Sequence, residues 1–277
     1  MKTLQTIAIQ GDRGSNSHIA ALQMLEPDAS ILPCSLSAEV VAAVLSGAAD
    51  AAVLPIENSL HGSVAEHYDL LLENPLRIDA EGLLRIEHNV IAAPGVRLED
   101  VRVLLSHPVA LSQCRRFLAE FKQARALPFY DTAGSVRHVV SERLADTAGI
   151  APRLAAEVYG GEVLVANIED HHENFTRFHL LRRADAPPPD AAAPVNKLSV
   201  AFSVEHRPGT LVQALQGLAA AGANLTRIES RPVQGSPWEY VFFVELRFEG
   251  DGMAAEVLRS LEAQSRFVRE LGRYPAA

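Results

Sequence analysis

The sequence predicts an α/β protein with two domains, a larger one built on a mostly parallel sheet and a smaller one with the order βαββαβ. Short apolar strands alternate with amphipathic helices up to residue 183, which is typical of a parallel sheet with helices on its faces. A Pro- and Ala-rich stretch at 184–194 is unsuited to helix or strand, and the residues beyond it follow the ferredoxin-like order. We therefore expect domains at 1–183 and 197–277, joined by a linker at 184–196.

In the larger domain, runs of apolar residues predict the strands, and apolar residues spaced by three or four predict the helices. The first strand leads into a glycine turn at 11–17, and Ser37 is a suitable N-cap for the second helix. The expected strands are 6–9, 51–54, 84–90, 101–105 and 127–130, and the expected helices are 18–25, one beginning near Ser37, 110–121 and 136–144.

In the smaller domain, apolar residues at every second position from Leu198 to Val204 predict a strand with one buried face. A helix follows the Pro208-Gly209 pair. The expected elements are a strand at 198–204, a helix at 211–218, strands at 224–231 and 238–248, a helix at 257–261 and a strand at 267–271.

The composition excludes several classes of protein. The chain has 277 residues, 48% of them hydrophobic, and a formal net charge of −9 without a basic stripe, which argues against a nucleic-acid partner. No stretch reaches the roughly 18 apolar residues of a membrane helix, and the start carries no signal-peptide core. We expect a cytoplasmic protein without a membrane partner. Cys34 and Cys114 are too few and isolated for a disulfide framework or a zinc site, so we expect no metal.

Polar side chains follow the carboxyl ends of four predicted strands, where ligands bind in open α/β sheets. We expect them to converge on one crevice. They are Ser15 and Ser17, then Glu57, Asn58 and Ser59, then Ser106 and His107, and finally Asp131 and Thr132. The later segment Asn174-Phe-Thr-Arg-Phe178 adds a hydroxyl and a permanent cation.

Other motifs argue against several common classes of binding and catalytic site. The Gly11–Gly14 turn has no Lys after its second glycine and lacks the dinucleotide fingerprint, although Ser15 and Ser17 at a helix N-terminus suit a carboxylate. The adjacent His171 and His172 are more typical of a solvated loop than of a metal site. No serine stands in a Gly-x-Ser-x-Gly elbow, which argues against a hydrolase.

Taken together, these segments resemble the prephenate dehydratase family across nearly the whole chain. The resemblance implies two α/β subdomains around a cleft, as in periplasmic binding proteins, followed by a regulatory ACT domain, with no chorismate mutase domain before residue 5. The similar segments are Leu54–Val64, Ser106–Cys114, Asp131–Ala133, Ala155–Gly160, Asn174–Phe178, Arg207–Leu211 and Asn224–Pro232.

The same resemblance implies roles for individual residues. Thr176 is the implied catalytic residue, and either Glu57 or His107 replenishes its proton. The implied substrate contacts are Ser15, Ser17, Asn58, Ser59, Ser106, Thr132, Asn174 and Arg177. Neighbouring side chains on a strand face opposite ways, so the alternative is that one of Thr176 and Arg177 braces the site instead. The implied phenylalanine contacts are Gly209, Thr210, Leu211, Asn224, Leu225, Glu229 and Ser230.

The implied activity is the decarboxylating dehydration of prephenate to phenylpyruvate, without a cofactor and regulated by L-phenylalanine in a homodimer or homotetramer. The loop from Gly11 to Ser17 departs from the family, which usually has proline after the glycine and ends in Thr-Phe-Ser. The preference for prephenate over arogenate therefore stays open. Thr210 also stands where many relatives carry alanine, which leaves open the affinity for the effector but not the position of its site. A non-catalytic amino-acid sensor is the alternative from another class.

Overall fold

The structure, a computed structural model, describes residues 5–25, 29–187, 194–233, 238–250 and 252–277. Residues 188–193 of the expected linker lie outside this part of the chain. The chain divides into a first unit, residues 1–67 and 82–180, and a second unit, residues 68–81 and 181–277. The stretch 68–81 is thus grouped with the C-terminal residues.

The first lobe of the first unit is built on a sheet with the strand order β2-β1-β3-β11-β5, with β4 pairing to β3. The central strand β1 runs parallel to both β2 and β3, and its residues Ile7, Ala8 and Ile9 are fully buried. The elements are β1 (Thr6–Gln10), α1 (Asn16–Met24), β2 (Ser30–Cys34), α2 (Ser37–Ser46), β3 (Ala51–Asn58), β4 (Gly62–Ser63), α3 (Ala65–Glu73), β5 (Leu76–Arg85) and β11 (Phe175–Arg183). Of these, α3, β5 and β11 are divided between the two units.

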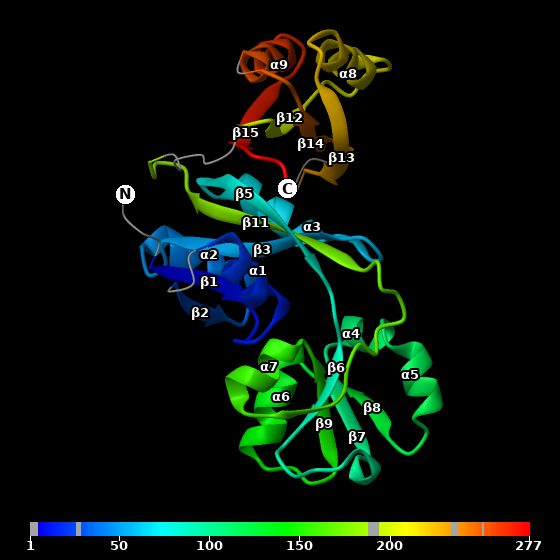
Figure 1. Cartoon of the computed structure of the whole chain (residues 1–277). Coiled ribbons are helices and arrows are strands. Elements are labelled where there is room, and N and C mark those ends of the chain that lie inside the picture. Colours follow the sequence, from blue (N-terminus) through cyan, green and yellow to red (C-terminus); the bar gives the residue numbers. More distant parts are fainter. Residues whose placement is uncertain (1–4, 26–28, 188–193, 234–237, 251) are drawn as a thin grey trace. The chain divides into compact units, whose positions relative to one another are not determined.

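The second lobe has a sheet of order β10-β6-β9-β7-β8, in which β7 runs parallel to β8 and β9 while β6 is antiparallel to its neighbours. Helices α6 and α7 cover one face of this sheet and α5 covers the other (Figure 1). The elements are β6 (Asn89–Ala92), the 3-10 turn η1 (Leu98–Asp100), β7 (Val103–Ser106), α4 (Pro108–Ser112), α5 (Arg115–Glu120), β8 (Arg125–Pro128), α6 (Thr132–Ser141), β9 (Thr147–Ala151), α7 (Arg153–Tyr159) and β10 (Glu162–Val165).

Long-range contacts change three of the predicted elements. The single strand expected at 84–90 is divided into β5 and β6, because the backbone between them turns to bond with Asn174 and Glu169. The helix expected at 110–121 is divided into α4 and α5, where Asp170 accepts the first free N–H groups of α5. Ser37 is the first residue of α2 and not its N-cap, and its hydroxyl contacts His67 Nε2 at 3.0 Å.

The second unit contains an antiparallel sheet of order β13-β14-β12-β15, with α8 and α9 on one face (Figure 1). The alternation seen in the sequence buries Leu198, Val200 and Phe202 against these helices. The elements are β12 (Lys197–Ser203), α8 (Thr210–Ala220), β13 (Asn224–Pro232), β14 (Tyr240–Arg247), α9 (Met253–Glu262) and β15 (Phe267–Tyr274). The βαββαβ order is confirmed. Among the described residues, no helix is long and apolar enough to cross a membrane.

Candidate active site

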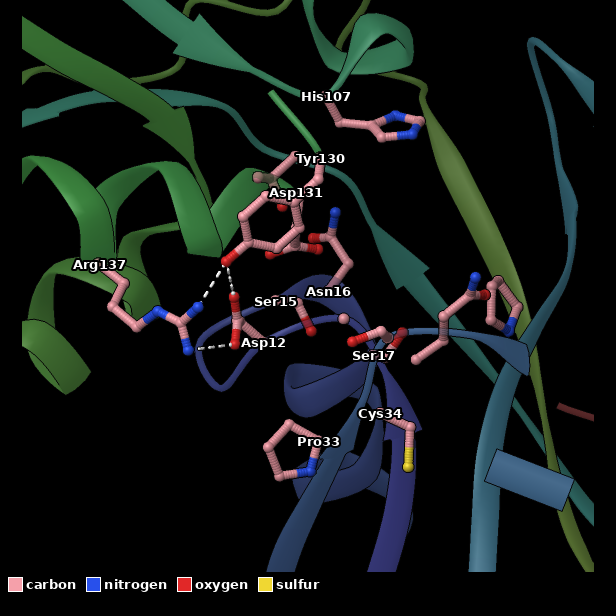
Figure 2. Close-up of a pocket in the computed structure, with 15 residues that line it drawn as sticks. Asp12, Ser15, Asn16, Ser17, Pro33, Cys34, His107, Tyr130, Asp131 and Arg137 are labelled. Carbon is pink, nitrogen blue, oxygen red and sulfur yellow. Dashed lines mark hydrogen bonds and ion pairs between the residues drawn. The ribbon is translucent and has the colours of Figure 1, made fainter. Parts of the chain in front are cut away.

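A cavity of about 590 Å³ lies in the first unit, lined by residues from both lobes (Figure 2). Four residues that the sequence assigned to substrate or catalysis are on its wall, namely Ser15, Ser17, His107 and Thr132. The complete lining is Gln10, Gly11, Asp12, Ser15, Asn16, Ser17, Pro33, Cys34, Ser35, Pro55, His107, Tyr130, Asp131, Thr132 and Arg137.

The turn between β1 and α1 supplies one wall because its glycines permit a sharp bend. Gly11 and Gly14 have φ angles of +94° and +85°, a conformation that other residues rarely adopt. Ser15 is the N-cap of α1, and its hydroxyl accepts from the His18 N–H at 3.4 Å. A Cβ atom on Gly14 would lie 2.7 Å from the Cα of Ala155, so this turn packs directly on α7 of the second lobe. The helix N-terminus is thereby held at the cavity.

Asp12, Tyr130 and Arg137 form a polar network across the two lobes that the sequence did not predict (Figure 2). Arg137 donates to Asp12 Oδ1 at 2.9 Å and to the Tyr130 oxygen at 2.6 Å, and the Tyr130 hydroxyl donates to Asp12 Oδ2 at 2.7 Å. Burial and the hydrogen bond to Asp12 raise the pKa of Tyr130 to about 12. Asp12 precedes Arg137 by 125 residues, so no sequence spacing signals their contact.

Asp131 places a second carboxylate in the cavity wall. Its side chain caps α6 by accepting from the Gly134 N–H at 2.7 Å, and it also accepts from the backbone N–H of Asp12. Burial raises the pKa of Asp131. Thr132 and the first turn of α6 are therefore fixed against the β1–α1 turn by backbone as well as side-chain contacts.

A second polar group, here called the Asn58 cluster, joins Asn58, Asn174 and Thr176. The Asn58 amide donates to Asn174 Oδ1 at 2.7 Å, to Thr176 Oγ1 at 2.9 Å and to the Phe175 carbonyl at 3.2 Å. Thr176 is only 8% exposed and Asn174 only 1%. Because the amide donates to the threonine oxygen, the hydroxyl's own hydrogen can point toward another acceptor.

Glu57 and Arg177 form an ion pair beside this cluster, with Arg177 donating to Glu57 Oε2 at 3.0 Å. Successive side chains on a strand face opposite sides, so β3 and β11 give one pair to each side: Asn58 with Thr176, and Glu57 with Arg177. The Arg177 side chain is 14% exposed. A guanidinium that already has a carboxylate partner is held rigidly in place.

Two of the expected substrate contacts have structural roles here. Ser59 ties its loop to β11, because its hydroxyl accepts from the Phe175 N–H at 3.0 Å and donates to the Glu173 carbonyl at 3.3 Å. Ser106 is fully buried, and its hydroxyl donates to the Ile150 carbonyl at 2.5 Å. The Ser106 side chain is therefore not expected to touch a ligand. His107 lies next to it as the N-cap of α4 and faces the cavity.

A chain of side chains that the sequence missed leads away from the Asn58 cluster. His61 Nδ1 lies 3.3 Å from Asn58 Oδ1 and 3.2 Å from Gln113 Nε2, and Gln113 Oε1 accepts from His88 Nε2 at 2.7 Å. His88 is 1% exposed, and burial lowers its pKa, which favours the neutral ring. His61 stands in the Leu54–Val64 segment, the one signal that pointed to it.

Nine of the expected catalytic and substrate residues fall into two groups, and Ser59 and Ser106 belong to neither. Ser15, Ser17, His107 and Thr132 line the cavity, whereas Glu57, Asn58, Asn174, Thr176 and Arg177 belong to the Asn58 cluster and the adjoining ion pair and do not appear in its lining. Pro55 of β3 does line the cavity, two residues before Glu57. Within the described residues, no three His, Cys, Asp or Glu side chains are grouped to hold a metal ion.

The expected effector residues lie in the second unit on α8 and β13. Gly209 is the N-cap of α8 with φ +87°, so its backbone requires glycine even though a Cβ atom would meet nothing within 4 Å. Thr210 donates to the Glu205 carbonyl at 2.6 Å, and Leu211 follows in the helix. On β13 the register shifts between Leu225 and Arg227, so Leu225 packs against the core under α8 and α9 while Glu229 lies opposite Phe243 on the other face of the sheet. Asn224 and Ser230 are exposed.

Comparison with known families supports the resemblance seen in the sequence. A profile of the family described as prephenate dehydratase matches residues 7–186, and a profile of the ACT domain matches residues 199–262. The first range covers the two sheets of order β2-β1-β3-β11-β5 and β10-β6-β9-β7-β8. The second range falls on the four-stranded sheet.

Individual relatives match over nearly the full chain. "Arogenate dehydratase/prephenate dehydratase 2, chloroplastic" from Arabidopsis thaliana is 39% identical over 97% of this chain and 72% of its own length. "Bifunctional N-acyl-homoserine lactone acylase/prephenate dehydratase" from Komagataeibacter europaeus is 38% identical over 98% of this chain and 96% of its own. The solved prephenate dehydratase from Arthrobacter aurescens in complex with L-Phe has a TM-score of 0.86 and 33% identity, covering 97% of this chain and 89% of that one. The chain therefore belongs to the prephenate dehydratase family and carries an ACT domain after its dehydratase domain.

Proposed function

We propose that this chain converts prephenate to phenylpyruvate by losing carbon dioxide and water, and that L-phenylalanine regulates it through the ACT domain. The observation that carries the proposal is the hydrogen bond from the Asn58 amide to Thr176 Oγ1 at 2.9 Å. A threonine hydroxyl is a weak acid, but one whose oxygen accepts a hydrogen bond is oriented to donate its own hydrogen elsewhere.

In the proposed reaction, the Thr176 hydroxyl donates a hydrogen bond to the ring hydroxyl of prephenate, which leaves as water once it has received a proton. The bond from the ring to its carboxylate breaks, its electron pair completes the aromatic ring, and carbon dioxide departs. Assistance of this kind by a positioned proton donor is worth about 10²–10⁴-fold in rate. Aromatisation supplies the driving force.

The proton that leaves with water must be supplied again, and two groups remain candidates. Glu57 is ion-paired to Arg177 on the side of β3 opposite Asn58, which suits a role in holding the guanidinium. His107 lines the cavity, where a bound ligand is within reach. We propose His107 as the donor. Because Arg177 lies on the side of β11 opposite Thr176 and is already paired with Glu57, we propose that it braces the site, and the variant Arg177→Lys tests whether it binds a substrate carboxylate instead.

Arogenate is a second candidate substrate, favoured by one observation. It differs from prephenate in carrying an ammonium group in place of the keto oxygen, and the cavity wall carries the carboxylates of Asp12 and Asp131. A carboxylate near the amino acid end of the ligand favours an ammonium group over a carbonyl. Asp12 stands where the family usually has proline, but its carboxylate is already paired with Arg137 at 2.9 Å, which offsets part of its charge.

The acylase activity in the name of the Komagataeibacter relative gains no support from the serine contacts. His61 Nε2 lies 3.2 Å from Ser112 Oγ, a hydroxyl–imidazole contact of the kind that nucleophilic catalysis uses. The Ser112 hydroxyl, however, donates to the Val109 carbonyl of its own helix at 2.7 Å. Its hydrogen is directed to the backbone and not to the imidazole.

The test is to incubate the purified chain with prephenate and, separately, with arogenate, and to measure phenylpyruvate and phenylalanine. Turnover of prephenate at a higher kcat/KM supports the proposal, and a higher value for arogenate selects the second candidate. Thr176→Ala should abolish most turnover, whereas Thr147→Ala, which removes another buried hydroxyl, should not. Binding of either compound without any turnover would identify a sensor instead.

We also propose that the ACT domain binds phenylalanine at a seam between two copies in a homodimer or homotetramer. The support is apolar surface on the edge strands of its sheet, where Ile228 on β13 is 44% exposed and Phe267 on β15 is 39% exposed. Light scattering with and without phenylalanine tests this, and a monomer under both conditions would contradict it.

A further inference from the structure

Helix α3 is directly connected to the Asn58 cluster at its N-terminal end. It follows the β3–β4 hairpin, in which Asn58 pairs with Gly62. The Val64 N–H, just before the helix, donates to the Ile56 carbonyl at 2.8 Å and ties the first turn to β3. Asn58 in turn donates to Thr176 Oγ1. A displacement of α3 is therefore passed through one short hairpin to the amide that orients Thr176.

The remainder of α3 belongs to the second unit and is held there by arginines of the ACT domain. Arg231 of β13 donates through Nε and Nη2 to the two carboxylate oxygens of Asp69, at 3.1 Å and 2.6 Å. The guanidinium carbon of Arg227 lies 5.1 Å from the centre of the Tyr68 ring, a cation–π contact. Tyr68 is only 3% exposed, so this part of the helix is enclosed.

A third arginine holds the C-terminal end of the helix. Arg269 of β15 donates to the carbonyls of Leu72 and Asn74. A cation at this end also interacts favourably with the helix dipole. Arginines from two strands of the ACT sheet, β13 and β15, thus contact α3 from Tyr68 to its last turn.

The strand β13 that supplies two of these arginines also carries the expected phenylalanine contacts Asn224, Leu225, Glu229 and Ser230. Arg227 and Arg231 alternate with Ile228 and Ser230, so they share the more covered face with Glu229. Arg227 lies 3.6 Å from the Glu229 carboxylate. A ligand that engages Glu229 therefore acts on the strand face that contacts α3.

We propose that α3 transmits the phenylalanine signal, with the Arg231–Asp69 pair as its main attachment to β13. Effector binding on β13 changes the position of α3, and the β3–β4 hairpin carries this change to the Asn58–Thr176 hydrogen bond. The inference rests on the proposed function and adds the residues through which the ACT domain acts on the reaction. Such a route requires only that the phenylalanine-bound and phenylalanine-free states differ in how β13 contacts α3.

Asp69→Asn in the full chain tests the proposal, because it removes the charge of the pair at nearly constant size. We expect kcat and KM without phenylalanine to stay within about twofold of the parent values. Phenylalanine should still bind, and its affinity measured by calorimetry should change by no more than the factor by which inhibition is lost. Inhibition at saturating phenylalanine should fall by at least about fivefold, the lower end of typical allosteric coupling. Asp69→Glu, which keeps a carboxylate, should retain most of the inhibition.

Glu270→Gln is the matched control, since Glu270 pairs with Arg273 at 2.8 Å on β15 and is about as exposed as Asp69. It should be inhibited normally. If phenylalanine inhibits Asp69→Asn normally, the proposal is overturned. It is also overturned if that variant no longer binds phenylalanine, because Asp69 would then stabilise the effector site itself. If the parent chain shows no turnover, the proposed function itself is overturned. If the parent chain turns over and binds phenylalanine but is not inhibited by it, the proposed regulation is overturned.

Discussion

The Asn58 cluster and the cavity are two polar regions of the first unit that are built in opposite ways. The cluster lies on the neighbouring strands β3 and β11, is buried, and its amides and hydroxyl bond to one another. The cavity is formed by helix N-termini and turns from both lobes, and it depends on contacts such as Asp12 with Arg137. The first is organised before any ligand arrives, as catalysis requires, while the second depends on the two lobes being together. Substitutions in the two regions should therefore have different kinetic signatures.

The largest expected effect is in the cluster. Thr176→Ala should lower kcat by at least about 10²-fold with little change in KM, because it removes a group that acts on the leaving hydroxyl and not on binding. Thr176→Ser, which keeps the hydroxyl, should recover much of the rate. Steady-state kinetics on prephenate measures both. A variant without the hydroxyl that turns over normally would assign the chemistry to another residue.

The second-largest effect is expected for a substitution in the cavity wall. Gly14→Ala places a Cβ atom 2.7 Å from the backbone of Ala155 in addition to the strain of its positive φ. It should lower the free energy of unfolding by about 2–4 kcal/mol and raise KM, since the two lobes are forced apart.

Gly47→Ala is the control for that substitution. Gly47 has φ +79° with nothing within 4 Å of the added Cβ, so it should cost only about 1–2 kcal/mol from backbone strain. Urea unfolding compares the two variants. Equal losses would mean that the contact with α7 does not hold the lobes.

Arg177→Lys tests whether the ion pair beside the cluster serves binding. The change keeps the positive charge but loses the planar fork, so if Arg177 grips a substrate carboxylate, KM should rise by about tenfold while kcat changes little. Glu57→Gln should have a smaller effect of the same kind, because Glu57 positions the guanidinium. An unchanged KM in the lysine variant would make Arg177 a structural residue.

The smallest effect concerns stability at acid pH. Burial lowers the pKa of His67 and of His88 below the ordinary value of about 6.5. As the pH falls through that value, the unfolded chain gains protons that the folded chain does not, so the free energy of unfolding decreases, by at most about 1.4 kcal/mol per pH unit for each histidine.

Unfolding in urea at pH 7.5 and 5.5 measures this dependence. His88→Asn should reduce the difference between the two pH values, since one of the two contributing histidines is gone. An identical difference in the variant would show that His88 is protonated as readily in the folded chain as in the unfolded one.

The fold could be predicted from the sequence wherever local pattern decides it. The alternation from Leu198 to Val204 and the polar residues that follow each strand led to the correct architecture. The pattern failed where distant residues intervene: Asp170 divides the predicted helix at 110–121, and Glu169 and Asn174 turn the chain after Arg85. Periodicity carries no information about such contacts.

The site could be predicted only in part for the same reason. Asn58 and Thr176 were singled out by motif, but their hydrogen bond joins residues 118 apart. Asp12 and Arg137 were missed because neither stands in a segment that resembles the family closely. The cavity residues lie at turns and helix N-termini whereas the Asn58 cluster lies on the paired strands β3 and β11, and the sequence does not show which of these polar ends meet in space.

The placement of α3 also limits how the ACT domain can be removed or exchanged. A chain that stops near Asp190 would lose the partners of Tyr68, whose ring packs edge-on to Phe243 at 5.1 Å. Leu71 and Ile78, now 1% exposed, lie in the same segment that packs with the C-terminal residues. The helix is thus a shared part, and a hybrid enzyme made by fusing this regulatory domain to another catalytic domain would have to transplant the matching face of α3 as well.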